Sequence, residues 1–265
     1  MAANGHSSRP GLFLDRLTRE SAGLALFLDF DGTLTEVAPT PDSAVAPAGL
    51  SDLLKRLSAR LGGALAVISG REIADLDMRL APFRGAAAGV HGAEIRLAPE
   101  SDADLGAAEL DPSALAEIRR LAAFEPRLLI EDKGASIAVH YRAAESAAPR
   151  LEAALERYIA AGAGGLRLLR GRKVFEVLSF GFSKAQAVTR FMETTPFAGR
   201  RPVMIGDDLA DLAAFDACVA RGGQGFRVAG ELFPASEADF SGPEAVRAWL
   251  ADLAAQLSYR QEPGK

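Results

Sequence analysis

LALFLDFDGTLTEV, residues 24–37, is the stretch that decides the fold of this chain, because its apolar run ends in two aspartates. The run predicts a buried parallel strand over residues 24–30, followed by a loop that begins at Asp-Gly. Asp29 and Asp31 carry like charges at the end of a buried strand, where they repel each other and resist desolvation. The usual compensating group is a divalent cation.

Two further apolar runs end in polar residues in the same way. ALAVISGR, residues 64–71, ends in Ser-Gly-Arg, and RPVMIGDD, residues 201–208, ends in two acids. A helical pattern follows each run, so strands and helices alternate, and this alternation predicts an α/β fold with a doubly wound parallel sheet. In such sheets function collects at the carboxyl ends of the strands. Three predicted strand ends carry polar side chains: Asp29 and Asp31, Ser69, and Asp207 with Asp208.

The middle of the chain, residues 98–178, interrupts this pattern. It combines a helical segment opened by Asp-Pro at 111–112, two pairs of strand-like runs and a helical segment near 146–161. This mixture predicts an inserted, smaller α+β domain, with the core formed by residues 11–97 and 179–265.

Several weaker signals complete this picture. Residues 1–10 are polar and rich in Gly, Ser and Pro, and are expected to be a disordered tail. The acidic stretch 98–111 is predicted to be a loop. FRVAG (226–230) and ADFSG (238–242) are predicted to be short strands near the far edge of the sheet.

Composition excludes some classes of protein. The 265 residues are 49% hydrophobic and 25% charged, with a net charge of −5, which argues against nucleic acid or an anionic membrane as the main partner. No apolar run approaches the ~18–20 residues that span a bilayer, and the start lacks the pattern of a secretory signal. We therefore expect a cytoplasmic protein that is a monomer or weak dimer. The one cysteine, Cys218, rules out an internal disulfide and is predicted to be a small buried hydrophobe.

The acids at the strand ends are suited to a hard cation. A parallel sheet would bring Asp29 to the same edge as Asp207, Asp208 and Asp211. Mg²⁺ fits best, since it prefers one or two carboxylates plus water and a phosphate oxygen. A single Asp at such a place is more often a helix cap or turn residue. Local capping, however, does not require DxD after one strand and GDDxxD after another.

The two aspartates of the first strand end also offer paired catalytic roles. One carboxylate can attack phosphorus, and a second can protonate the leaving oxygen and then activate water. Asp29 ends the strand itself and is the candidate nucleophile, while Asp31 lies farther out, within reach of a leaving group.

Donors for a phosphate come from two other places in the sequence. Ser69, with the backbone of Gly70 and Arg71, could donate to phosphate oxygens, although an ordinary helix N-cap is the alternative role for this serine. Lys184 could neutralise a nucleophile and a transferring phosphoryl group, or be a solvated helix residue. His140 is expected to be a packed or hydrogen-bonded strand residue, and His91, in a turn at a strand end, is a candidate for the site.

DFDGTLT, then ISGR, then a lysine that opens a helix, then GDDLAD resemble the four motifs of the haloacid dehalogenase superfamily of phosphatases, in their usual order. Within that superfamily the chain is similar to the trehalose-6-phosphate phosphatase family across nearly its whole length. The segments GVHGAE, IEDKGASIAVHYR and GRKVFEV carry this narrower resemblance.

The resemblance implies a Mg²⁺-dependent phosphatase that hydrolyses trehalose 6-phosphate through an aspartyl-phosphate, as the last step of trehalose biosynthesis. Asp29 would be the nucleophile and Asp31 the general acid/base. Mg²⁺ would be held by Asp29, the Asp31 backbone carbonyl and Asp207, with Asp208 or Asp211 outside them. Phosphate would be bound by Thr33, Ser69, Gly70, Arg71 and Lys184. The inserted segment would be a mobile cap that contacts the sugar through Glu131, Lys133, Arg172 and Glu176. His91, because of its place in a turn at a strand end, is a further candidate for the sugar site. Departures from the family pattern are Arg172, where Lys is usual, and Ala185, Ala210 and Leu212.

Three alternatives stay open. A phosphatase for another sugar phosphate, such as sucrose, mannose or glucosylglycerol phosphate, would share the core and differ in the cap residues. A phosphorelay receiver also uses an acceptor Asp, an acidic Mg²⁺ site and a Lys, but it is much shorter and its acidic pair precedes the acceptor. A sugar-phosphate sensor would gain nothing from a nucleophile beside an acid.

Overall fold

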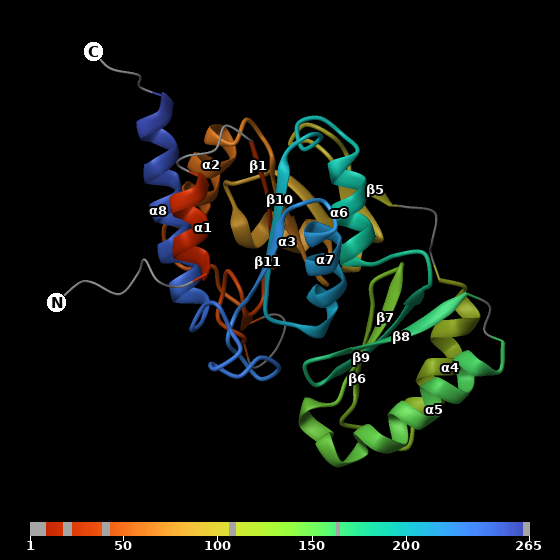
Figure 1. Cartoon of the computed structure of the whole chain (residues 1–265). Coiled ribbons are helices and arrows are strands. Elements are labelled where there is room, and N and C mark those ends of the chain that lie inside the picture. The colour runs from red at the N-terminus through yellow and green to blue at the C-terminus, as the bar shows by residue number, and fades with distance from the viewer. Residues whose placement is uncertain (1–8, 18–22, 39–42, 106–109, 163–164, 262–265) are drawn as a thin grey trace.

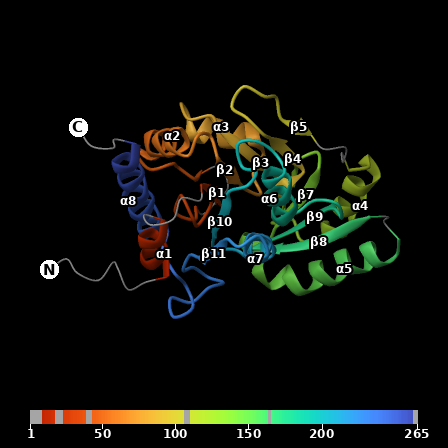
Figure 2. The ribbon, with the colours of Figure 1, turned by 45° about the horizontal axis from the view of Figure 1, so that its top comes forward.

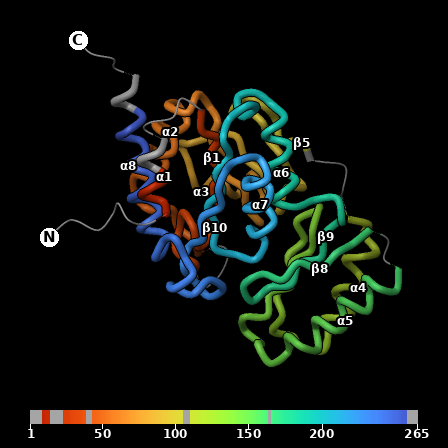
Figure 3. Tube along the Cα trace, in the orientation of Figure 1, coloured from red at the N-terminus to blue at the C-terminus, as the bar shows by residue number. Residues whose placement is uncertain are grey.

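The chain forms two units, each built on its own sheet (Figure 1). The computed structural model describes residues 9–17, 23–38, 43–105, 110–162 and 165–261. The larger unit, the core, contains a seven-stranded sheet, and the smaller unit, the cap, contains a four-stranded sheet. The chain enters the cap at α4 (Pro112–Ala122) and returns to the core at α6 (Lys184–Met192) (Figure 3).

The core sheet has the strand order β11-β10-β1-β2-β3-β4-β5. Neighbours from β11 to β3 are parallel, whereas β4 pairs antiparallel with β3 and with β5. The parallel strands are β1 (Leu24–Leu28), β2 (Leu65–Ile68), β3 (Ala86–Gly89), β10 (Arg201–Gly206) and β11 (Gln224–Arg227). The antiparallel ones are β4 (Glu94–Arg96) and β5 (Asp104–Leu105). The predicted α/β fold with a mostly parallel central sheet and a separate smaller unit is confirmed.

Helices cover both faces of the core sheet. Helices α1 (Arg9–Leu17), α2 (Leu50–Arg60) and α8 (Pro243–Gln261) lie on one side, and α6 and α7 (Leu209–Val219) lie on the other (Figures 1 and 2). Because both faces are covered, β1 and β2 are buried at every residue, as their continuous apolar runs predict. None of the described helices is long and apolar enough to cross a membrane.

The register of the parallel strands brings their carboxyl ends to one edge of the core. Leu28 of β1 pairs with Ile205 of β10, and the Asp29 backbone N–H donates to the Ile205 carbonyl at 3.0 Å. On the other side of β1, Leu28 pairs with Val67 of β2, so Ser69 also emerges at this edge. Helix α3 (Ile73–Leu80) begins just after Ser69.

The cap sheet has the order β6-β7-β9-β8 and is antiparallel throughout. Its strands are β6 (Leu129–Asp132), β7 (Ser136–His140), β8 (Leu166–Gly171) and β9 (Val174–Ser179). Alternate side chains, including Ile137, Val139 and Val177, pack in a cluster with Ile118 of α4 and Leu151 of α5 (Ala148–Ala160). The side chains between them, such as Glu131 and Glu176, lie on the opposite face, because successive residues of a strand alternate.

Three expectations about local structure differ from what the chain adopts. The stretch predicted to be an acidic loop contains β5, which extends the core sheet although it falls inside the segment assigned to the insertion. ADFSG is not a strand, since it makes a single bridge between Phe240 and Val228. Residues 9 and 10 of the expected tail begin α1, and residues 1–8 lie outside the described part of the chain. Cys218 is fully buried as predicted, and burial raises the pKa of its thiol to about 12.

Candidate active site

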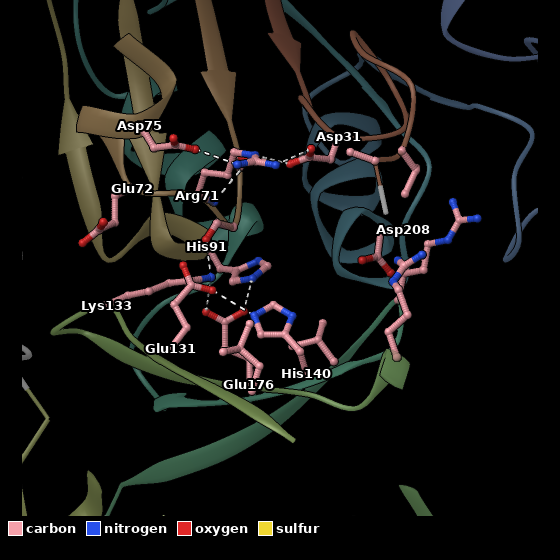
Figure 4. A pocket seen from close by; sticks show the side chains of 18 of the residues that line it. Asp31, Arg71, Glu72, Asp75, His91, Glu131, Lys133, His140, Glu176 and Asp208 are labelled. Carbon is pink, nitrogen blue, oxygen red and sulfur yellow. Dashed lines mark hydrogen bonds and ion pairs between the residues drawn. The ribbon is translucent and has the colours of Figure 1, made fainter. Parts of the chain in front are cut away.

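A cavity of about 530 Å³ lies between the strand ends of the core and the open face of the cap sheet (Figure 4). Small-molecule sites typically enclose about 300–1,000 Å³. The core contributes Asp29, Asp31, Ser69, Gly70, Arg71, His91, Lys184, Asp207 and Asp208 to its walls, and the cap contributes Glu131, Lys133, His140, Arg172 and Glu176. Most of the predicted site residues therefore meet at one place, although they come from strands and loops far apart in sequence.

Asp29 is held by a buried lysine. The Lys184 Nζ lies 2.6 Å from Asp29 Oδ1 and 2.7 Å from Asp211 Oδ1. Burial alone would lower the pKa of Lys184, but Asp211 and Asp29 outweigh it and raise that pKa, so the ammonium stays charged. Lys184 is therefore a fixed cation at the candidate nucleophile and not a solvated helix residue.

Asp207 faces Asp29 and owes its position to two residues of the DFDGT motif. The Thr33 hydroxyl donates to Asp207 Oδ1 at 3.2 Å. Gly32 has a φ of 81°, and a Cβ added there would lie 2.0 Å from Asp207 Oδ2, so only glycine leaves room for this carboxylate. Thr33 was predicted to bind phosphate. Its side chain instead is fully buried and orients Asp207.

Three carboxylates, from Asp29, Asp207 and Asp211, have oxygens within 4.8 Å of one another. Burial raises the pKa of Asp29 well above its usual range, although Lys184 opposes this, and burial with the nearby Asp211 raises the pKa of Asp207 to about 7. One lysine does not compensate three buried carboxylates. The donor set, all oxygen and open to the cavity at Asp29 and Asp207, fits Mg²⁺.

The structure separates the roles of Asp208 and Asp211. Asp211 is fully buried, and its second oxygen accepts the Asp208 backbone N–H at 3.0 Å, which caps α7. Both of its oxygens are thus occupied inside the protein. Asp208 lines the cavity but lies outside the three-carboxylate cluster, and its side chain accepts from the Leu209 N–H at 2.5 Å.

Arg71 contacts Asp31 directly (Figure 4). Its Nε lies 2.5 Å from Asp31 Oδ2 and its Nη2 lies 2.8 Å from Oδ1, while Nη1 donates to Asp75 at 2.7 Å. Despite its burial, these carboxylates raise the pKa of Arg71. The sequence predicted that Arg71 binds phosphate, whereas here its guanidinium is paired with two carboxylates.

The Ser69–Gly70 turn lies at the floor of the cavity. Ser69 does not cap α3, whose N-cap is Glu72. Its hydroxyl accepts the Arg71 backbone N–H at 3.1 Å and retains a proton to donate. Gly70 has no room for a side chain, because a Cβ would lie 2.6 Å from His91 Nε2.

The cap presents Glu176 and Lys133 to the core (Figure 4). Glu176 Oε2 lies 2.8 Å from His91 Nε2, and its Oε1 accepts from Lys133 at 3.3 Å and from Ser136. Lys133 Nζ also donates to the Gly70 carbonyl at 2.9 Å, so the cap contacts the floor of the cavity. Burial would raise the pKa of Glu176, but Lys133 and His91 outweigh it and lower that pKa well below its usual range.

Glu131 and Arg172 line the cavity and are each paired with another side chain. His140 Nε2 lies 2.9 Å from Glu131 Oε2, and this hydrogen bond lowers the pKa of Glu131. Arg172 lines the cavity, but its Nε lies 2.8 Å from Glu231 of the core, so here it contributes to an ion pair between cap and core.

Sequence reasoning left the partner of one side chain at the site open and missed another side chain. His140 was expected to be a packed or hydrogen-bonded strand residue, and it pairs with Glu131. Asp75, on α3, was not singled out, yet it contacts Arg71. The hairpin register could have indicated His140, because Glu131 pairs with Ala138 and His140 follows two residues later on the same face. The i,i+4 spacing of Arg71 and Asp75 was a weaker signal.

Comparison with known proteins adds independent information. The family model described as trehalose-phosphatase matches residues 27–240. A probable trehalose-phosphate phosphatase from Sinorhizobium fredii is 40% identical over 245 residues, covering 91% of this chain and 92% of that protein. A trehalose-6-phosphate phosphatase from Escherichia coli is 35% identical over 247 residues, with 91% of each chain covered.

Solved structures support the fold. The C-terminal domain of a trehalose-6-phosphate phosphatase from C. albicans superimposes with a TM-score of 0.78 at 20% identity, covering 93% of this chain and 97% of that one. A haloacid dehalogenase-like hydrolase from Bacteroides thetaiotaomicron superimposes with a TM-score of 0.61 at 17% identity, covering 88% and 100%. At these identities the likeness concerns the fold alone.

Proposed function

Because this chain belongs to the trehalose-phosphatase family, we propose that it is a phosphoric monoester hydrolase that converts trehalose 6-phosphate to trehalose and phosphate, with Mg²⁺ and through an aspartyl-phosphate on Asp29. The observation that carries this proposal is the placement of Asp29 and Asp31 on one cavity, opposite the polar face of the cap. The division into a catalytic core and a recognition cap is part of the same proposal.

In the first step an Asp29 oxygen attacks phosphorus while the bond between phosphorus and the sugar oxygen breaks. Asp31 gives its proton to the departing sugar oxygen. In the second step a water oxygen attacks the phosphorus on Asp29 and its proton passes to Asp31. The bond between phosphorus and Asp29 then breaks, which releases phosphate and restores both carboxyl groups.

The surrounding charges support this sequence of steps. Lys184, 2.6 Å from Asp29, holds the nucleophile and offsets the negative charge of the incoming phosphoryl group. Asp29 and Asp207 would hold Mg²⁺, together with the Asp31 backbone carbonyl. The ion, when bound, neutralises charge on the phosphoryl oxygens. Asp211 keeps Lys184 in place, since its own oxygens are already occupied.

The cap supplies groups suited to a sugar. Carboxylates accept hydrogen bonds from hydroxyls and ammonium groups donate to them, so Glu131, Lys133 and Glu176 form a mixed set for a neutral disaccharide. Closing the cap over the substrate would also exclude bulk water from the aspartyl-phosphate. His91 and Arg172, which also line the cavity, would be further sugar contacts.

The test is phosphate release from trehalose 6-phosphate by the wild type and by Asp29→Asn. The variant is expected to keep its fold and lose turnover, whereas Asp216→Asn, the same change at an exposed residue of α7, should leave turnover intact. Mass spectrometry of acid-quenched enzyme should find a phosphoryl group on the peptide that contains Asp29. Unchanged turnover in Asp29→Asn would contradict the mechanism, which requires Asp29 as the nucleophile.

A further inference from the structure

We infer that Arg71, itself held by Asp75, is a positioning residue that aims the Asp31 carboxylate at the oxygen of the leaving group. This inference rests on the proposed function, in which Asp31 is the acid/base. Both Asp31 oxygens are engaged by one guanidinium, at 2.5 Å from Nε and 2.8 Å from Nη2. Such a two-point contact fixes the plane of a carboxylate as well as its distance.

The Arg71 side chain is itself fixed on several sides. Nη1 donates to Asp75 Oδ2 at 2.7 Å, and the guanidinium lies 5.6 Å from the centroid of the Phe30 ring. The fully buried Phe30 ring, next to Asp31 in the sequence, thus gives the guanidinium an aromatic surface to pack against. The side chain of Arg71 is only 11% exposed.

Asp75 is also held in place. Arg79, one turn later on α3, contacts both of its oxygens at 2.9 and 2.8 Å and donates to the Ala44 carbonyl as well. The chain of contacts thus runs from Ala44 through Arg79, Asp75 and Arg71 to Asp31. Helix α3 thereby provides a rigid support for a carboxylate that lies in a loop.

Asp31 needs such a support more than Asp29 does. Asp29 is 6% exposed at its side chain and held by buried Lys184, whereas the Asp31 side chain is 35% exposed on the loop that follows. A displacement of 1 Å in a reacting group can cost about 10²-fold in rate. A carboxylate has about four lone-pair positions, and the guanidinium occupies one on each Asp31 oxygen. The remaining positions are available for the proton that Asp31 transfers.

This arrangement assigns Arg71 to the carboxylate instead of the phosphate. Three of the five N–H groups of the guanidinium are donated to Asp31 and Asp75 within 2.8 Å, so two carboxylates already fix its position and largely offset its charge. The two roles predict different kinetics. A phosphate ligand acts on every phosphate ester alike, whereas an aid to the acid acts most on esters whose leaving group needs a proton.

Phenyl phosphate and 4-nitrophenyl phosphate separate these roles, because they are similar in size but phenolate is the poorer leaving group. The quantity to measure is kcat/KM, which reports steps through the departure of the leaving group. General acid catalysis contributes about 10²–10⁴-fold, so we expect Arg71→Lys and Asp75→Asn to lower kcat/KM for phenyl phosphate about 10-fold or more, and for 4-nitrophenyl phosphate much less. Asp77→Asn is the matched control, because Asp77 lies on the same helix and pairs with Arg96 at 2.6 Å. Asp77→Asn should leave the ratio of kcat/KM for phenyl phosphate to kcat/KM for 4-nitrophenyl phosphate unchanged.

The outcomes are distinct. If Arg71→Lys and Asp75→Asn lower kcat/KM equally for both substrates, the inference is overturned and Arg71 is instead a ligand of the phosphoryl group. If one variant does not fold, the other decides. Asp31→Asn should lower the ratio by itself, and adding Asp75→Asn to it should lower the ratio no further. If Asp31→Asn leaves the ratio unchanged, the acid/base role of Asp31 fails, and the premise is refuted separately from the positioning.

Discussion

Replacing Lys184 by Met should destabilise the protein strongly, because it leaves two buried carboxylates without their cation. The Lys184 Nζ lies 2.6 Å from Asp29 and 2.7 Å from Asp211, and the three side chains are 3%, 6% and 0% exposed. Removing one partner of a buried ion pair typically costs about 3–5 kcal/mol. In a domain of this size each kcal/mol lowers Tm by about 2–4 °C, so we expect a loss of about 6–20 °C.

The assay is thermal unfolding followed by circular dichroism in a chelating buffer. Lys55→Met is the control, since Lys55 is 44% exposed and 4.0 Å from Asp52, and exposed substitutions usually change stability by less than about 0.5 kcal/mol. Adding Asp211→Asn to Lys184→Met should recover part of the loss, because it removes one of the unpaired charges. A Tm equal to that of the wild type in Lys184→Met would refute the view that this lysine compensates the buried acids.

Three further predictions follow from particular contacts. Gly32→Ala should lower kcat/KM about 10²-fold by displacing Asp207, whose Oδ2 lies 2.0 Å from the added Cβ, and Gly49→Ala, which shares the left-handed φ but meets nothing within 4 Å, should not. Mg²⁺ affinity measured by calorimetry should weaken as pH falls through about 7, because burial raises the pKa of Asp207 and a protonated carboxyl is a poor ligand, and an affinity independent of pH would contradict a ligand with a raised pKa at this position. Burial acts to raise the pKa of Glu176, but Lys133 and His91 outweigh burial and lower that pKa below its ordinary value of 4.5. The ionised Glu176 therefore stabilises the fold fully above pH 4.5, and this stabilisation is lost as the pH falls below 4.5. The Tm of the wild type should therefore fall more steeply below about pH 4 than that of Glu176→Gln, and parallel curves would contradict this.

The parts of the site at strand ends could be predicted from the sequence, because they follow from the parallel sheet. Each buried run shows itself as a continuous apolar stretch, and its last residues must emerge at one edge. Asp29, Ser69 and Asp207 are therefore brought together by topology, whatever the details of side-chain packing. The prediction of the cap residues Glu131 and Glu176 rested on the resemblance to a family, and in the structure both residues line the cavity.

The choice of partners among nearby polar groups could not be predicted in the same way. From the sequence, Arg71 could bind either a phosphate or a carboxylate. Its contact with Asp31 depends on the packing of α3, which places Asp75 against the same guanidinium. Likewise the sequence does not show which group accepts the Thr33 hydroxyl; in the structure it is Asp207, which lies close over Gly32.

Short edge pairings also escaped prediction, for a different reason. The two-residue strand β5 is fixed by its ladder with β4 and not by any apolar run of its own. ADFSG has the composition of a strand, but Phe240 makes one bridge and its side chain packs against Phe226 and Trp249. Segments of this length carry too little periodicity to separate a strand from an extended loop.

The measurement that tests the central claim most directly is kcat/KM with Mg²⁺ for trehalose 6-phosphate, beside glucose, sucrose and mannose 6-phosphates and an aryl phosphate. The account predicts a strong preference for trehalose 6-phosphate, which Glu176→Ala should reduce while leaving the aryl phosphate less affected. Activity on the other sugar phosphates alone would contradict the proposed substrate, and no release of phosphate from any of them by folded protein would contradict the proposed chemistry.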